Sequence, residues 1–279
     1  MISKKNKKQL FNKKRADFSL GLAAFALMVL GVVMIFSASV FVGQRYFDNP
    51  KIFFVRQLIS LIFAVIVWVI VQQIDYRFWK KWAVGIFIVS LGLLLIVFLF
   101  PEINGSHSWI VFGPLRFQPS ELTKITLIIY LAAWFDRRSE EIKKITVGFL
   151  PFAVIVGLIG LLILSQPDLG TFIVIFLIAA SMYFFANAPL LHFIVAGILA
   201  FIGFWSMIWQ VDYRRERILT FLDPAKNTLD ASYHIQNILI AVGSGSWWGL
   251  GFGASKQKRL FLPEPHTDSI FSVIVEETG

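Results

Sequence analysis

The stretch FSLGLAAFALMVLGVVMIFSASVFV, residues 18–42, decides the fold class of this chain. It carries no charged side chain and exceeds the roughly 18 apolar residues that mark a bilayer-spanning helix. The basic residues before it would also suit a secretory signal, but the apolar run is about twice the usual length of such signals. It also lacks an A-x-A-like cleavage site followed by a soluble domain. We therefore expect residues 18–42 to be a retained first transmembrane helix.

Similar apolar runs recur along the 279 residues, of which 57% are hydrophobic and 15% charged, with a mean hydropathy of +0.72. A soluble domain of this length carries about 25% charged residues. The sequence thus predicts an all-α polytopic membrane protein, with seven complete transmembrane helices within 18–211 and the start of an eighth at 269–279. The predicted spans are 18–42, 53–72, 83–101, 121–136, 145–164, 170–186 and 190–211.

The charge distribution predicts how the chain is threaded. The net charge of +9 would suggest nucleic-acid binding in a soluble protein. Membrane proteins concentrate Lys and Arg in cytoplasmic segments, so we expect no nucleic-acid partner and a cytoplasmic N-terminal tail, residues 1–17. Alternate threading then places the basic loops 75–82 and 136–144 inside. It places 102–120, 165–169 and the long loop 212–268 on the extracytoplasmic side.

Two classes of site are not expected. The chain has no cysteine, which excludes disulfides, thiol catalysis and cysteine metal ligation within these residues. Its four histidines show neither HxxxH nor HExxH spacing, so a zinc site built from histidine alone is not expected either.

Three carboxylates lie where an apolar helix meets the predicted outer face: Glu121 in QPSELTK, Asp168 in SQPDLGT and Asp268 in PHTDSIF. Ionisable groups beside membrane spans are costly and are candidates for function. Each also has a structural interpretation. Asp168 and Asp268 could cap the helices that follow them, and Glu121 could pair with Lys124 on one helix face.

The long loop 212–268 is rich in cations and contains the glycine-rich run GSGSWWGLGFG, residues 243–253. Guanidinium groups can grip phosphate oxygens, although a mixed, solvated surface is the plainer interpretation. The glycines could cradle a phosphate, give the backbone flexibility or allow close helix packing. They follow no predicted strand and do not match G-x-x-x-x-G-K-[ST], so a nucleotide site is not expected.

Six segments taken together resemble the SEDS family of bacterial membrane proteins, which comprises FtsW, RodA and SpoVE. They are FQPSELTK (117–124), SQPDLGT (165–171), YRRERILTFLDP (213–224), YHIQNILIAVGSG (233–245), GFGASKQK (251–258) and LPEPHTDSIF (262–271). GFGASKQK followed by LPEPHTD is closer to the FtsW branch. Two departures are Ser269, where many members have Phe, and EETG in place of EELG at 276–279.

The resemblance implies a ten-helix glycosyltransferase of the bacterial cytoplasmic membrane that polymerises lipid II into peptidoglycan, so this chain is expected to be truncated in its eighth helix. The implied partners are lipid II, a class B penicillin-binding transpeptidase and other proteins of a division or elongation complex. Asp268 is the implied catalytic residue. Candidate contacts to the substrate or its pyrophosphate are Glu121, Lys124, Arg214, Arg217, Lys256, Lys258 and His266, while Ser120, Gln166 and Asp168 are structural or site residues.

No cofactor is certain, but a divalent cation, Mg²⁺ or Mn²⁺, could join the carboxylates to the lipid's phosphates. Two other functions stay open. Glu121 and Lys124 within a span would also suit a transporter that flips lipid II. A scaffold that recruits a transpeptidase and division proteins would need the loop and the helix faces, but not Asp268.

Overall fold

The computed structural model describes residues 18–103, 105–112, 115–209, 215 and 230–279. The predicted tail 1–17 lies outside these residues. The chain divides into two compact units, of which one spans Val71–Gln210 and the other combines Met1–Ile70 with Val211–Gly279. Each unit is described by itself.

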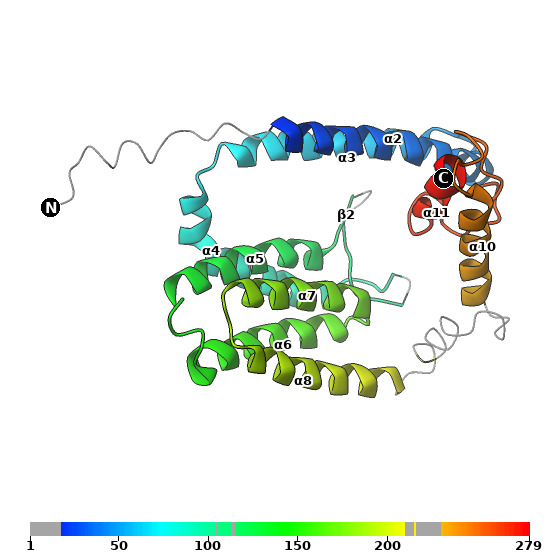
Figure 1. Cartoon of the computed structure of the whole chain (residues 1–279). Coiled ribbons are helices and arrows are strands. Elements are labelled where there is room, and N and C mark those ends of the chain that lie inside the picture. Colours follow the sequence, from blue (N-terminus) through cyan, green and yellow to red (C-terminus); the bar gives the residue numbers. More distant parts are fainter. Residues whose placement is uncertain (1–17, 104, 113–114, 210–214, 216–229) are drawn as a thin grey trace. The chain divides into compact units, whose positions relative to one another are not determined.

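The unit Val71–Gln210 is built from helices and one short hairpin. Its helices are α4 (Tyr76–Ile96, continued by the 3-10 turn η1, Val97–Leu99), α5 (Pro119–Arg137), α6 (Leu150–Leu164, preceded by the π-helical turn η2, Ile145–Phe149), α7 (Leu169–Phe185) and α8 (Leu190–Trp209). The strands β1 (Ile110–Phe112) and β2 (Leu115–Phe117) pair antiparallel, with Ile110 opposite Phe117. In Figure 1, α5, α6 and α7 lie side by side, and α7 contacts both α5 and α6.

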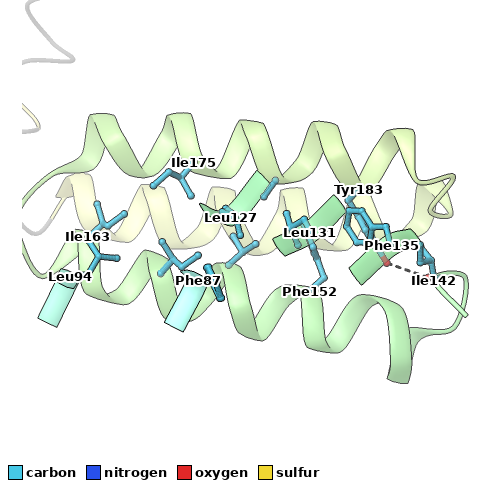
Figure 2. Close-up of a cluster of buried hydrophobic side chains, with 13 residues drawn as sticks. Phe87, Leu94, Leu127, Leu131, Phe135, Ile142, Phe152, Ile163, Ile175 and Tyr183 are labelled. Atoms are coloured by element: carbon cyan, nitrogen blue, oxygen red, sulfur yellow. Dashed lines mark hydrogen bonds between the residues drawn. The ribbon is translucent and has the colours of Figure 1, made fainter. Parts of the chain in front are cut away.

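The core of this unit is a continuous apolar cluster between these helices. Figure 2 shows Leu127 and Leu131 of α5 among side chains from α4, α6 and α7. Tyr183 stacks on Phe152 with ring centroids 4.3 Å apart, and its hydroxyl donates to the carbonyl oxygen of Ile142 at 3.4 Å. One buried polar contact joins α4 to α5, since the Thr126 hydroxyl donates to Ser90 Oγ at 2.8 Å.

Helix α4 begins well before the predicted span 83–101. Asp75 caps it, because an oxygen of its carboxylate accepts the backbone N–H of Arg77 at 2.8 Å. The first turns carry Arg77, Lys80 and Lys81, whose charges interrupt the hydropathy although they do not interrupt the helix. Hydropathy therefore located the apolar part of α4 and missed its charged beginning.

The second unit contains α2 (Phe18–Phe47), α3 (Ile52–Gln72), α10 (Asp230–Gly245) and α11 (Ile270–Thr278). Helix α10 packs against α11, and Figure 1 shows them adjacent. A small core joins Met34 and Ala38 of α2 to Ala241 of α10, Leu262 of the loop and Val273 of α11.

Helix α10 differs from the expectation that 212–268 is a loop throughout. Its sequence DASYHIQNILIAVGSG mixes polar and apolar residues, so no long hydrophobic run marks it. It is stabilised by burying one apolar side, including Ala241, and such amphipathic helices are recognised by periodicity rather than by mean hydropathy.

Four helices of the described residues are long and apolar enough to cross a membrane: Ser19–Phe47, Ile52–Gln72, Tyr76–Leu99 and Ile145–Leu164. Helix α3 has no buried residue within the described structure. Helix α7 is apolar but shorter, at 17 residues. The predicted all-α polytopic membrane fold is confirmed apart from the short hairpin, while the count of seven spans stays a prediction.

Candidate active site

Asp268 is exposed and makes no hydrogen bond or ion pair with any described residue. It directly precedes Ser269, which occupies the N-cap position of α11. Asp268 therefore does not cap α11, and the capping alternative for this residue is wrong. Its backbone lies beside the N-terminal, positive end of the α11 helix dipole.

The backbone beside Asp268 is held by Ser269, which is 1% exposed. The Ser269 hydroxyl donates to the carbonyl oxygen of Pro263 at 2.9 Å and lies 2.7 Å from Nε2 of His234 on α10. The Asp268 carboxylate is therefore exposed, while the backbone next to it is held in place by Ser269.

A groove of about 650 Å³, here called the aromatic groove, is lined in part by the loop that ends at His266, two residues before Asp268. Its walls come from the end of α2, the start of α3 and α10, and the loop that leads to Asp268. They include Arg45, Tyr46, Phe47, Phe53, Tyr233, Pro265 and His266. The aromatic faces suit an apolar chain, and the Arg45 guanidinium offers one cation in a wall that also contains the Glu264 carboxylate.

His266 forms part of the groove wall and is 11% exposed. Its ring lies 4.1 Å from that of Phe53, centroid to centroid, and its Nε2 lies 3.9 Å from a carboxylate oxygen of Glu264. Nδ1 has no hydrogen-bond partner among the described residues. Burial lowers the pKa of His266, which the nearby Glu264 carboxylate partly opposes.

The two candidate lysines of GFGASKQK differ in surroundings. Lys256 is exposed, and its side chain makes no hydrogen bond or ion pair with the described residues, while its backbone N–H donates to Glu276 Oε1 at 2.9 Å. Lys258 is 3% exposed and directs its ammonium to Glu277 Oε1 at 2.5 Å and to Ser37 Oγ at 2.9 Å. Lys256 is therefore available to an anion, whereas the charge of Lys258 is compensated inside the protein.

Sequence reasoning missed the buried acids of α11. Glu276 and Glu277 are each 1% exposed, and both accept hydrogen bonds from the loop 255–258 or from α2. Two adjacent acids in the apolar run SVIVEETG were the available signal, since carboxylates are almost never fully buried unless they are paired. Arg45 was also missed, because it lies just past the apolar part of α2.

In the other unit, Glu121 and Lys124 form the predicted ion pair on α5, with Lys124 Nζ 2.8 Å from the carboxylate. Their side chains are 58% and 23% exposed. The neighbouring Ser120 is 1% exposed, and its hydroxyl has no partner among the described residues. The pairing interpretation is confirmed, so the charge of Lys124 is partly neutralised.

Asp168 is the N-cap of α7, as its capping interpretation predicts: Oδ1 accepts the backbone N–H of Thr171 at 3.0 Å. Its Oδ2 accepts from Gln118 Nε2 at 3.3 Å. Gln166 is buried and donates from Nε2 to the carbonyl oxygen of Leu94 at 3.1 Å. Both side chains therefore connect α7 and its preceding turn to other segments of this unit.

The glycine-rich run 243–253 allows close packing of helices, as one of its interpretations predicts. A Cβ on Gly245 would lie 2.2 Å from the carbonyl oxygen of Val275 on α11. The backbone N–H groups of Leu250 and Gly251 donate to the carbonyl oxygens of Glu276 and Glu277 at 2.9 and 3.0 Å. Because these amides are engaged, they are not available to cradle a phosphate.

Two parts of the predicted site are untested. Arg214 and Arg217 lie outside the described residues. The expected convergence of Glu121, Asp168 and Asp268 joins residues of both units and stays a prediction. Among the described residues, no three His, Asp or Glu side chains gather as a metal site, and the expected divalent cation, held by carboxylates and the lipid's phosphates, stays a prediction.

Comparison with known proteins places the chain in a family. Residues 18–279 match the cell cycle proteins FtsW, RodA and SpoVE. The probable peptidoglycan glycosyltransferase FtsW of Nitrosococcus halophilus is 40% identical over 261 residues, which cover 92% of this chain and 67% of that protein. The proteins of the same name from Aromatoleum aromaticum and Geobacter sulfurreducens are 36% and 38% identical, and the chain spans 64% and 72% of their lengths.

Solved structures are similar as well. A peptidoglycan synthase complex, studied for its coordination of polymerization and crosslinking, contains a chain 27% identical with a TM-score of 0.73, covering 94% of this chain and 71% of that one. The rod shape determining protein RodA of Thermus thermophilus is 26% identical with a TM-score of 0.55, covering 68% of this chain and 60% of that one. The resemblance expected from six short motifs is confirmed: the chain is a multi-pass membrane protein and belongs to the cell cycle protein family of FtsW, RodA and SpoVE.

Proposed function

We propose that this chain carries the catalytic aspartate of a peptidoglycan glycosyltransferase, which polymerises lipid II at the outer face of the bacterial cytoplasmic membrane during cell division. The observation that carries the proposal is the state of Asp268, an exposed carboxylate that has no partner among the described residues and follows the groove-lining His266 by two positions in the chain. The names of the relatives support the reaction class.

In the proposed reaction, Asp268 acts as a general base. Its carboxylate takes the proton from the 4-hydroxyl of the acceptor sugar while that oxygen bonds to the anomeric carbon of the donor. The donor's bond to its pyrophosphate breaks, and polyprenyl pyrophosphate leaves with the bonding electrons. Base catalysis of this kind contributes about 10²–10⁴-fold to a rate.

The leaving pyrophosphate gains negative charge, which nearby cations stabilise more strongly in the transition state than in the ground state. Arg45 in the groove wall and the exposed Lys256 are the described cations best suited to this role. Arg214 and Arg217 stay candidates from sequence, whereas Lys124 is already paired with Glu121. Apolar faces of the groove would accommodate the start of the lipid chain.

The test uses the full-length protein with Asp268→Asn, which keeps the shape of the side chain and removes its basicity. We expect glycan polymerisation from purified lipid II to fall to background, with expression and membrane insertion unchanged. Glu140→Gln removes an exposed carboxylate from the other unit and serves as the control, with activity retained. Polymer made at the normal rate by Asp268→Asn would refute the base assignment.

The same assay separates the other two functions. A protein that only flips lipid II makes no polymer in detergent, where no bilayer separates two compartments. A scaffold would support growth of a depletion strain with Asp268→Asn, whereas the enzyme would not. We further propose a class B penicillin-binding transpeptidase as the partner, within a division complex, since a similar solved structure is a peptidoglycan synthase complex.

A further inference from the structure

We propose that Lys258 is a positioning residue, not a ligand of the substrate. Together with Glu277 and Ser37 it forms a buried ion-pair cluster, here called the Lys258 clamp, which fixes the loop that carries Asp268. The inference rests on the proposed function, because its consequence for activity assumes that Asp268 is the base.

The geometry of the clamp leaves no room for a second anion at the ammonium. Lys258 and Glu277 have side chains 3% and 0% exposed, with Nζ 2.5 Å from Oε1. Ser37 of α2 donates to both carboxylate oxygens at 3.0 Å and accepts from Lys258 Nζ at 2.9 Å. A charge buried in this way is retained because its partner compensates it.

Glu276 extends the anchoring to the backbone. Its Oε2 accepts from the Ser255 hydroxyl at 2.6 Å, and its Oε1 accepts from the backbone N–H of Lys256 at 2.9 Å. Ser255 Oγ in turn accepts the backbone N–H of Lys258 at 3.1 Å. Glu276 thus holds one turn of the loop through Ser255 and a backbone N–H, and Glu277 holds the same turn through Lys258.

The loop from this turn to Asp268 is short and fixed at both ends. At its start, the Lys258 clamp ties it to α2 and α11. At its middle, Leu262 is 3% exposed in the small core with Met34 and Val273. At its end, Ser269 bonds to His234 of α10. Loosening the first anchor therefore changes where Asp268 sits relative to the groove.

The experiment compares Lys258→Met, Glu277→Leu and the double variant in the full-length protein. Each single variant leaves one buried charge without its partner. A misplacement of a catalytic group by about 1 Å can lower a rate about 100-fold. We expect each to reduce kcat strongly while KM for lipid II changes little. The double variant replaces both partners with apolar groups, which is often neutral for a buried pair, and it should recover most of kcat.

Recovery in the double variant distinguishes positioning from substrate contact. If Lys258 gripped the pyrophosphate, Lys258→Met would raise KM, and the double variant would stay as impaired as the single one. That result would overturn the proposal.

A second readout does not depend on activity. Hydrogen exchange of peptides covering 255–269 should accelerate in both single variants and slow again in the double variant. Peptides of α6 and α7 in the other unit should not change, which controls for general unfolding.

Unchanged exchange in the single variants would refute the clamp, even if the wild-type protein made no polymer. Accelerated exchange with normal kcat would refute its positioning role. Absence of polymer from wild type would count against the proposed function alone.

Discussion

Asp268 and Glu277 show how surroundings decide what a carboxylate can do. Glu277 is fully buried and bound to Lys258 and Ser37, so its carboxylate has a structural role. Asp268 is exposed and has no described partner, so its lone pairs are available to a reacting hydroxyl. Of the two acids, the less constrained one is the better candidate for proton transfer.

His266 leads to a prediction at this scale. Its pKa is lowered in the folded protein because its ring is buried, so the folded state favours the neutral form. The unfolded chain has the ordinary pKa of about 6.5 and binds the proton first as the pH falls. The contribution of His266 is therefore fully present above that value and is lost as the pH falls toward the folded-state pKa.

We accordingly expect the thermal unfolding midpoint of the purified protein to decrease as the pH is lowered from about 7.5 to about 5.5. His266→Gln should make this fall shallower, since glutamine does not titrate. An unchanged slope in His266→Gln would contradict the prediction.

At single residues, the sequence supported some assignments and missed others for a physical reason. The cap at Asp168 and the Glu121–Lys124 pair follow from local spacing, and both are present. Burial of Lys258 against Glu277 depends on a contact between a loop and a helix end, which no local pattern encodes. The sequence therefore predicts a loop lysine that is available to a ligand.

At the scale of elements, the contact of α10 with α11 explains the glycine at 245. A Cβ there would meet the carbonyl oxygen of Val275 at 2.2 Å and Glu276 Cα at 2.9 Å, which are backbone atoms that cannot swing aside. On the same helix, a Cβ at Gly243 would meet nothing within 4 Å. The two glycines form a matched pair for mutation.

Gly245→Ala should destabilise the protein by about 1–3 kcal/mol, the usual cost of overpacking. Gly243→Ala should be neutral or stabilise by up to about 1 kcal/mol, because alanine favours helix more than glycine does. The check is the unfolding midpoint of each variant in detergent. Equal effects of the two substitutions would show that α10 and α11 are not packed this closely.

Hydropathy predicted the apolar helices well because lipid imposes a minimum length on uncharged segments. It missed α10 and the first turns of α4, whose polar residues are tolerated for local reasons. In α4, Asp75 caps the charged turn. In α10, one side meets the small core through Ala241. Predicting either helix segment requires knowing which group it contacts, and a hydropathy profile does not contain that information.

At the scale of the molecule, the threading through the membrane can be tested directly, because the chain has no cysteine of its own. Trp247 is 90% exposed, and Glu140 is also exposed. We expect an impermeant thiol reagent to label Trp247→Cys on intact spheroplasts and to label Glu140→Cys only after permeabilisation. The reverse pattern would place 212–268 in the cytoplasm and remove the basis for the proposed function.

The membrane fold and its family follow from the sequence because apolar length and six motifs extend over nearly the whole chain. The assembled site does not follow in the same way. Asp268 with its groove belongs to one unit and Glu121 with Asp168 to the other, so their proximity depends on how the units meet.

Helix α3, which has no buried residue, has a consequence for how this chain can be redesigned. In a helix without buried side chains, hydrophobicity constrains the choice of residue more than the fit to neighbouring side chains does. Its central side chains, such as Ile62, should be exchangeable among aliphatic types with little loss of function, while a single arginine at the same place would be rejected during insertion.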